Sequence, residues 1–177
     1  MNRLIPAAAR AAALAGGAVL IALTAMTCLS IAGRAGLTLS GIFDLPGIFA
    51  QMRPVRGDYE LIEAGTAIAI CAFLPRATLA GAHARVDLLG GLLSPRADRA
   101  LNALWDWLMA GALALLAWKL AEGMVAKRAA QETSFLLQLP IWWAYAACLA
   151  GMIIALATAI WVAAGHHRRP APGDGAA

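Results

Sequence analysis

The ionisable residues that could perform chemistry in this chain gather at the two ends of one apolar segment. Glu60 and Glu63 precede the segment, and no residue between Ala64 and Pro75 is charged. The candidates that follow it are His83, Arg85 and Asp87. Because a charged side chain is costly inside a bilayer, charges placed only near the ends of the segment indicate that it crosses a membrane.

None of these residues forms a recognisable catalytic group. His83 and Asp87 are four residues apart, so a helix would place them on one face as a hydrogen-bonded pair. Two such ligands are a weak signal for a metal, and we find no nucleophile with a base and no phosphate-binding loop. We expect no enzymatic activity, no catalytic, metal-binding or substrate-binding residue, and no cofactor. Asp106 lies inside a predicted span, where we expect a position near the membrane surface rather than a proton relay.

The composition is that of a protein that crosses the membrane several times. Hydrophobic residues make up 62% of the 177 residues and charged residues only 14%, against about a quarter charged in soluble domains. The net charge of +4 does not indicate nucleic acid as a partner, because the fourteen Lys and Arg residues are spread over every loop. The three cysteines each lie in a different apolar segment, with no metal or redox spacing, so we interpret them as small apolar fillers.

Four segments have the length of about 20 apolar residues that a membrane helix needs. They are residues 11–33, 59–80, 101–120 and 139–165. We therefore predict an all-α integral membrane protein with a single four-span domain over residues 1–165. The first apolar run is too long for a secretion signal, so we expect it to be an uncleaved span. Residues 166–177 are expected to form a disordered cytoplasmic tail.

The connections between these spans differ in length. Glycine and proline in residues 34–58 predict a break, filled by either a short interfacial helix or a mobile loop. Residues 77–93 fit a connector at the membrane surface. Ser94 and Pro95 form a good helix start, and no proline follows until Pro140. A helix over residues 95–130 would measure about 54 Å, so this third helix must tilt strongly or project beyond the apolar core of about 30 Å.

Two patterns in the later spans suggest how the helices are placed. Trp142 and Trp143 begin the last span and Trp161 stands near its end, about 28 Å away along a helix, which matches two interfacial aromatic belts. Small residues recur at helical spacing and could form close packing faces. These are Ala147, Gly151, Ala155 and Ala159 in the last span, with Ala110 and Ala114, and Ala117 and Ala121, in the third.

The distribution of positive charge gives a weak prediction of orientation. With four spans, eight of the Lys and Arg residues fall on the side of the two termini and six on the other side. Positively charged loops favour the cytoplasm, and Arg168 and Arg169 follow the last span directly. We therefore expect both termini to be cytoplasmic.

Several motifs, in their order and spacing, resemble the small membrane subunit of tripartite ATP-independent periplasmic (TRAP) transporters, the DctQ-like family. The second segment carries GDYELIE, AFLPRATL and GAHARVDLL. TCLSIAGR at residues 27–34 resembles the end of the family's first span, and ETSFLLQLPIWWAYAACLAG at residues 132–151 resembles the start of its fourth. The resemblance covers residues 11–165. The loop at residues 36–57 is longer than the family usually has.

The resemblance implies a non-catalytic subunit in the bacterial inner membrane, surrounded by lipids. It would bind a large permease subunit that holds the sodium and substrate sites, while a periplasmic solute-binding protein delivers an organic acid. Glu60 and Glu63 would then face the periplasm, and His83, Arg85 and Asp87 the cytoplasmic edge. The long helices would brace the immobile scaffold of an elevator-type carrier.

Two other functional classes compete with this interpretation. One is a self-sufficient homodimeric proton-coupled transporter, which would need a membrane-embedded acid such as Glu63 or Asp106. The other, a membrane-bound redox protein, fails because the sequence offers neither paired cysteines nor histidines facing each other across spans.

Overall fold

The computed structural model describes residues 4–43, 55–81 and 95–166 of the chain. Four helices in these ranges are each long and apolar enough to cross a membrane, which confirms the predicted all-α membrane fold. They are α1 (Leu4–Phe43), α3 (Asp58–Ala80), α4 (Pro95–Ala129) and α5 (Trp142–His166). The expected surface connector, with His83, Arg85 and Asp87, lies outside the described residues, as does the tail beyond His166.

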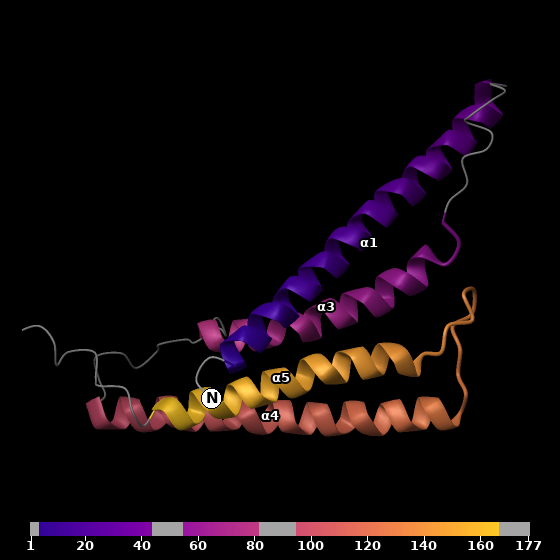
Figure 1. The fold of residues 1–177 in the computed structure, drawn as a ribbon. Coiled ribbons are helices and arrows are strands. Elements are labelled where there is room, and N and C mark those ends of the chain that lie inside the picture. Colours follow the sequence, from indigo (N-terminus) through magenta and orange to yellow (C-terminus); the bar gives the residue numbers. More distant parts are fainter. Residues whose placement is uncertain (1–3, 44–54, 82–94, 167–177) are drawn as a thin grey trace, which may run out of the picture.

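Successive helices along the chain run in opposite directions and lie in the spatial order α1, α3, α5, α4, so that the neighbours α3 and α5 run in the same direction (Figure 1). The last turns of α1 and α4 and the first turns of α3 and α5 therefore gather at one end, which we call the loop end. The first turn of α1 and the last turn of α5 lie at the opposite end. Toward the loop end, α1 diverges from α3 (Figure 1).

The first helix is longer than the sequence predicted. We expected the span to end at Gly33 and a loop to follow, but α1 continues without a break to Phe43. The two glycines in this extension, Gly36 and Gly41, each cost a helix only about 1 kcal/mol relative to alanine. No proline lies between Gly33 and Pro46, so nothing forces an established helix to stop at Arg34.

The other helix boundaries lie close to the predictions. Helix α3 contains Pro75 and continues to Ala80, where Gly81 ends it in a left-handed conformation with φ of 63°. Helix α4 begins at Pro95 and has 35 residues, as the serine–proline start and the absence of later prolines indicated.

Glycines allow each neighbouring pair of helices to approach closely. A Cβ atom added to Gly16 of α1 would lie 3.0 Å from Ala72 of α3. One added to Gly151 of α5 would lie 2.8 Å from the backbone carbonyl of Cys71 in α3. Between α4 and α5, a Cβ on Gly123 would lie 2.8 Å from the Tyr145 ring. In lipid, such close contact between helices supplies much of the packing energy.

The largest buried cluster joins α4 to α5. Its members are Ala110, Leu113, Ala117, Met152, Ala155 and Ala159. On both helices the cluster members are spaced three and four residues apart, and Ala114 of α4 is exposed. Ala110 and Ala114 therefore do not form one buried face among the described helices, and a face that packs on another subunit stays a prediction.

Asp106 belongs to the same face of α4. Its side chain is only 8% exposed, and it lies one turn before Ala110, on the side that packs against α5. A fully exposed side chain is therefore excluded, while the expected depth of Asp106 near the membrane surface stays a prediction.

Candidate functional site

The loop end of the molecule is held together by carboxylates from the first turn of α3. Glu60 accepts two hydrogen bonds from backbone N–H groups of the segment between α4 and α5, which we call the α4–α5 loop (residues 130–141). The Glu60 carboxylate oxygens lie 2.7 Å from the nitrogen of Leu136 and 3.0 Å from that of Leu137. One side chain thereby joins α3 to a segment 76 and 77 residues further along the chain.

The α4–α5 loop presents these N–H groups because it folds back on itself. Thr133 and Pro140 form an antiparallel bridge, and the Ser134 nitrogen donates to the Leu139 carbonyl at 2.8 Å. Gln138 closes the turn with a φ of 54°, a left-handed conformation that non-glycine residues adopt at a cost. In this narrow turn, Leu136 and Leu137 have their backbone donors free to bind Glu60.

Gly57 provides the space into which the loop packs. It precedes α3 in a left-handed conformation with φ of 73°, which favours glycine. A Cβ atom at this position would lie 2.4 Å from Cγ of Leu137. The missing side chain therefore allows Leu137 to sit directly over the start of α3, next to its bond with Glu60.

A second carboxylate joins α3 to α1. Oδ2 of Asp58 lies 2.5 Å from Oγ of Ser30 and 2.7 Å from a guanidinium nitrogen of Arg34. Ser30 is 1% exposed, so the hydroxyl bond is buried, whereas the Arg34 side chain is 63% exposed. An exposed ion pair contributes little on its own, but the shared oxygen fixes two successive turns of α1 against α3.

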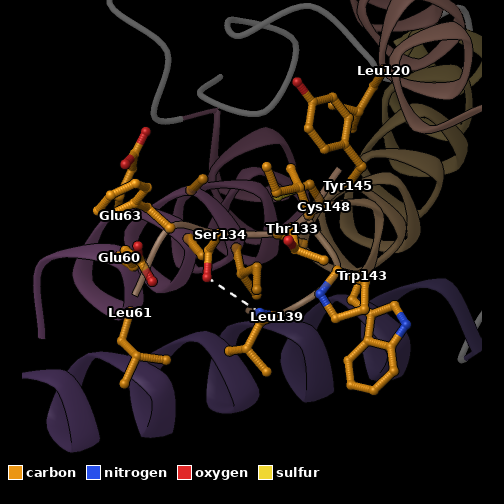
Figure 2. Close-up of a pocket in the computed structure, with 17 residues that line it drawn as sticks. Glu60, Leu61, Glu63, Leu120, Thr133, Ser134, Leu139, Trp143, Tyr145 and Cys148 are labelled. Carbon is orange, nitrogen blue, oxygen red and sulfur yellow. Dashed lines mark hydrogen bonds between the residues drawn. The ribbon is translucent and has the colours of Figure 1, made fainter. Parts of the chain in front are cut away.

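A groove of about 720 Å³ opens beside these contacts (Figure 2). Figure 2 shows Glu60 and Glu63 on one side of it, with Leu120, Trp143 and Tyr145 on the other. The α3 wall consists of Glu60, Leu61, Glu63, Ala64, Ala67 and Ile68. The opposite wall comes from the α4–α5 loop and from the first turns of α5, down to Cys148.

Glu63 differs from Glu60 in having a carboxylate that the fold does not use. It is exposed, and within the described part of the chain it makes no hydrogen bond or ion pair. Its position on the α3 wall places an accessible negative charge at a largely apolar groove. This is the arrangement that suits an amphipathic molecule with a positive group.

The tryptophans at the start of α5 lie beside the groove. Trp142 and Trp143 make an edge-to-face contact with ring centroids 6.0 Å apart. The guanidinium carbon of Arg128 lies 5.2 Å from the centre of the Trp142 ring, within the range of a cation–π interaction. Trp143 is 57% exposed and lines the groove. This end of α5 therefore has the composition of a membrane–water interface.

The small residues predicted on α5 lie along one side of the helix and differ in burial. Gly151 and Ala155 are buried, and Gly151 faces the backbone of Cys71 in α3. Ala147 is exposed. Gly151 and Ala155 thus lie at the centre of the helix layer, where α5 contacts both α3 and α4, and Ala147 lies away from it.

Four important residues of the loop end were not identified from the sequence. They are Ser30, Asp58, Leu136 and Leu137. The bonds to Leu136 and Leu137 use backbone atoms, so their side chains carry no signal. Asp58 had a detectable signal, since an acid directly after glycine and before an apolar helix is typical of a helix start. Its partners on α1 could not be known, because spacing along the chain does not show which turns of two helices meet.

The described residues contain no group of three or more His, Cys, Asp or Glu side chains that could hold a metal ion. The candidate site therefore consists of contacts between helices and an amphipathic groove.

Comparison with protein families gives a match over residues 23–168 to the family described as tripartite ATP-independent periplasmic transporters, DctQ component. Neither a curated protein nor a solved structure matches the chain significantly.

Proposed function

Because this chain belongs to the DctQ family of tripartite ATP-independent periplasmic transporters, we propose that it braces a large permease subunit during solute uptake. The family makes it a small subunit of a transporter, and its four apolar helices make it a multi-pass protein of the inner membrane. The finer proposal is that the large subunit moves an organic acid with sodium, after a periplasmic solute-binding protein delivers it. Our chain would take no part in the chemistry and would hold the scaffold in place.

The observation that carries this proposal is the family match over most of the chain. The helix layer supports it, because large apolar side chains remain exposed along the outer helices. Examples are Leu14, Ile21 and Leu29 on α1 and Leu104, Leu108 and Leu115 on α4. A single layer of helices has two open faces and two open edges, which lipid or a second membrane protein must cover. The contacts at the loop end would keep such a layer rigid against a moving partner.

We further propose that the termini are cytoplasmic and the loop end periplasmic. The alternating directions of the helices place the first turn of α1 and the last turn of α5 at the same end (Figure 1). The excess of Lys and Arg on that side favours the cytoplasm. Glu60 and Glu63 would then lie where a periplasmic binding protein docks.

Co-purification tests the proposal. We would tag this chain, express it with the large membrane protein encoded beside it, and purify the pair in mild detergent. A complex of fixed one-to-one stoichiometry that takes up solute in liposomes only when the binding protein is added is the expected result. Expression with an unrelated multi-pass protein is the control for nonspecific association in detergent. Purification of this chain alone as a homodimer that moves substrate or protons would contradict the proposal.

The bracing role makes a separate prediction about the complex. Glu60→Gln weakens the bonds to the α4–α5 loop and should reduce uptake while the two subunits still co-purify. Glu122→Gln is the matched control, since Glu122 is an exposed glutamate that pairs only with Lys119 on its own helix, at 2.7 Å. Equal uptake by the two variants would show that the loop contact does not contribute to bracing.

One observation favours the alternative of a self-sufficient proton-coupled transporter, namely the buried Asp106. An acid enclosed between membrane helices is a common feature of proton pathways. If the isolated chain moved protons in liposomes and Asp106→Asn abolished that movement, the accessory role would be replaced by this one. Under the bracing proposal, the isolated chain moves none, with or without the substitution.

A further inference from the structure

We propose that the groove beside Glu63 binds one phospholipid whose headgroup carries an ammonium group with N–H donors. The ammonium would lie at the Glu63 carboxylate, and the first part of the acyl chains would lie along the apolar wall. The inference concerns the groove alone and does not depend on a transport role. It commits to lipid rather than to a partner protein, for the reasons that follow.

Polarity changes steadily along the groove. Its α3 wall begins with Glu60 and Glu63 and continues with Ala67 and Ile68, so the change takes eight residues, or about 12 Å of helix. The opposite wall carries the hydroxyls of Thr133 and Ser134 in the α4–α5 loop and ends at Cys148 in α5, with mostly apolar residues between them. A groove that is polar at one end and apolar at the other matches a molecule with a head and a tail.

The charges at the polar end of the groove determine which lipid headgroup it can bind. The described lining residues include two acids and neither lysine nor arginine. Glu60 is occupied by the N–H groups of Leu136 and Leu137, whereas Glu63 is available. An ammonium group would neutralise Glu63 and donate hydrogen bonds to it. An anionic headgroup would meet a carboxylate and no cation among these residues, which disfavours it.

The groove also lies at the correct depth for a headgroup. Trp143 and Tyr145 line it on the side opposite Glu63 (Figure 2). Tryptophan and tyrosine are enriched where headgroups meet the hydrocarbon core. The acidic end of the groove therefore lies at headgroup level, and its apolar end points into the core.

The dimensions favour a lipid over a helix of a partner protein. A volume of about 720 Å³ is typical of sites for small molecules. The groove follows α3 for about 12 Å, whereas a membrane-spanning helix presents a face of about 30 Å. A spanning helix could contact the rim, but most of its length would lie outside the groove.

The test measures lipid retention by the full-length chain purified in mild detergent. Native mass spectrometry would be run after equal addition of phosphatidylethanolamine, phosphatidylcholine and phosphatidylglycerol. We expect one phosphatidylethanolamine to be retained about fivefold more strongly than the other two, as one exposed charge contact allows. Phosphatidylcholine is the critical comparison, because its headgroup has the same charge but no N–H donor.

Two substitutions at Glu63 locate the site. Glu63→Gln should remove the preference, and Glu63→Lys should reverse it toward phosphatidylglycerol, since a cation would replace the carboxylate. Glu122→Gln, an exposed glutamate on α4, should leave the preference unchanged. Reversal by lysine is informative even if the glutamine variant retains some binding through its amide.

Three results would overturn the inference. They are equal retention of the three lipids by the unchanged chain, an unaltered preference in both Glu63 variants, and quantitative release of phosphatidylethanolamine when the large membrane protein binds. The last result would assign the groove to a protein. Because the first two measurements use the isolated chain, their failure leaves the bracing proposal intact, and failure of co-purification leaves lipid binding intact.

Discussion

Ser30 of α1 donates a hydrogen bond to Asp58, the first residue of α3, across 2.5 Å. The same Asp58 oxygen accepts a bond from Arg34, one turn further along α1. Few other polar contacts join neighbouring helices in the described part of the chain. The Asp58 contact therefore helps to fix the position of α1 against α3. Its buried member is the serine, at 1% exposure.

A double-mutant cycle with Ser30→Ala and Asp58→Ala should show coupling. Each substitution is expected to lower the unfolding temperature in detergent, and the pair together should lower it by less than the sum, because both remove the same bond. Ser30→Ala combined with Glu122→Ala is the control pair and should be additive. Additivity in both pairs would mean that the Ser30–Asp58 bond contributes nothing to stability.

Glu60→Gln should expose the α4–α5 loop. The substitution removes the charge that strengthens the bonds from the Leu136 and Leu137 N–H groups. Hydrogen exchange of a peptide covering residues 132–141 should then become about tenfold faster, since local opening controls exchange in such a loop. Glu63→Gln, one turn along the same helix, should leave the rate unchanged in lipid-free detergent. A similar acceleration in both variants would point to a general effect on α3.

Gly57→Ala should destabilise the chain more than Gly81→Ala. Both glycines have left-handed backbones, with φ of 73° and 63°, so each alanine costs about 1–2 kcal/mol in conformation. Only at Gly57 does the new methyl group also collide with Leu137. Thermal unfolding in detergent measures the difference.

Adding Leu137→Ala to the Gly57→Ala variant separates these two costs. The second substitution should recover part of the lost stability, because it removes the atoms with which the methyl group collides. No recovery would show that backbone strain accounts for the whole effect at this position.

Gly151→Ala and Gly111→Ala should change stability in opposite directions. A methyl group at Gly151 would lie 2.8 Å from the Cys71 backbone, and we expect this overpacking to cost about 1–3 kcal/mol. Gly111 on α4 has no atom within 4 Å of an added Cβ, so the better helix propensity of alanine should stabilise by up to about 1 kcal/mol. Unfolding midpoints of the two variants provide the comparison, and a stabilising Gly151→Ala would contradict the close contact of α3 with α5.

The sequence by itself determined the number of spans, their approximate bounds and the length of α4. These properties depend on runs of apolar residues, prolines and charges, which act locally and can be read along the chain. The end of α1 was predicted too early because glycine lowers the stability of a helix without ending it. Whether such a helix continues depends on the residues that pack against it. The family motifs are also short contiguous stretches of sequence, so they could be recognised without the tertiary structure.

Only the tertiary structure decided which residues meet. The Glu60 contact joins a carboxylate to backbone N–H groups 76 and 77 residues away, and backbone donors are identical at every residue except proline. Asp58 meets Ser30 only because α3 packs against α1 at this turn. The burial of Asp106 and the exposure of Ala114 depend on the rotation of α4 against α5, which spacing alone does not fix. Contacts between distant segments depend on how the helices pack, and that is a property of the whole layer.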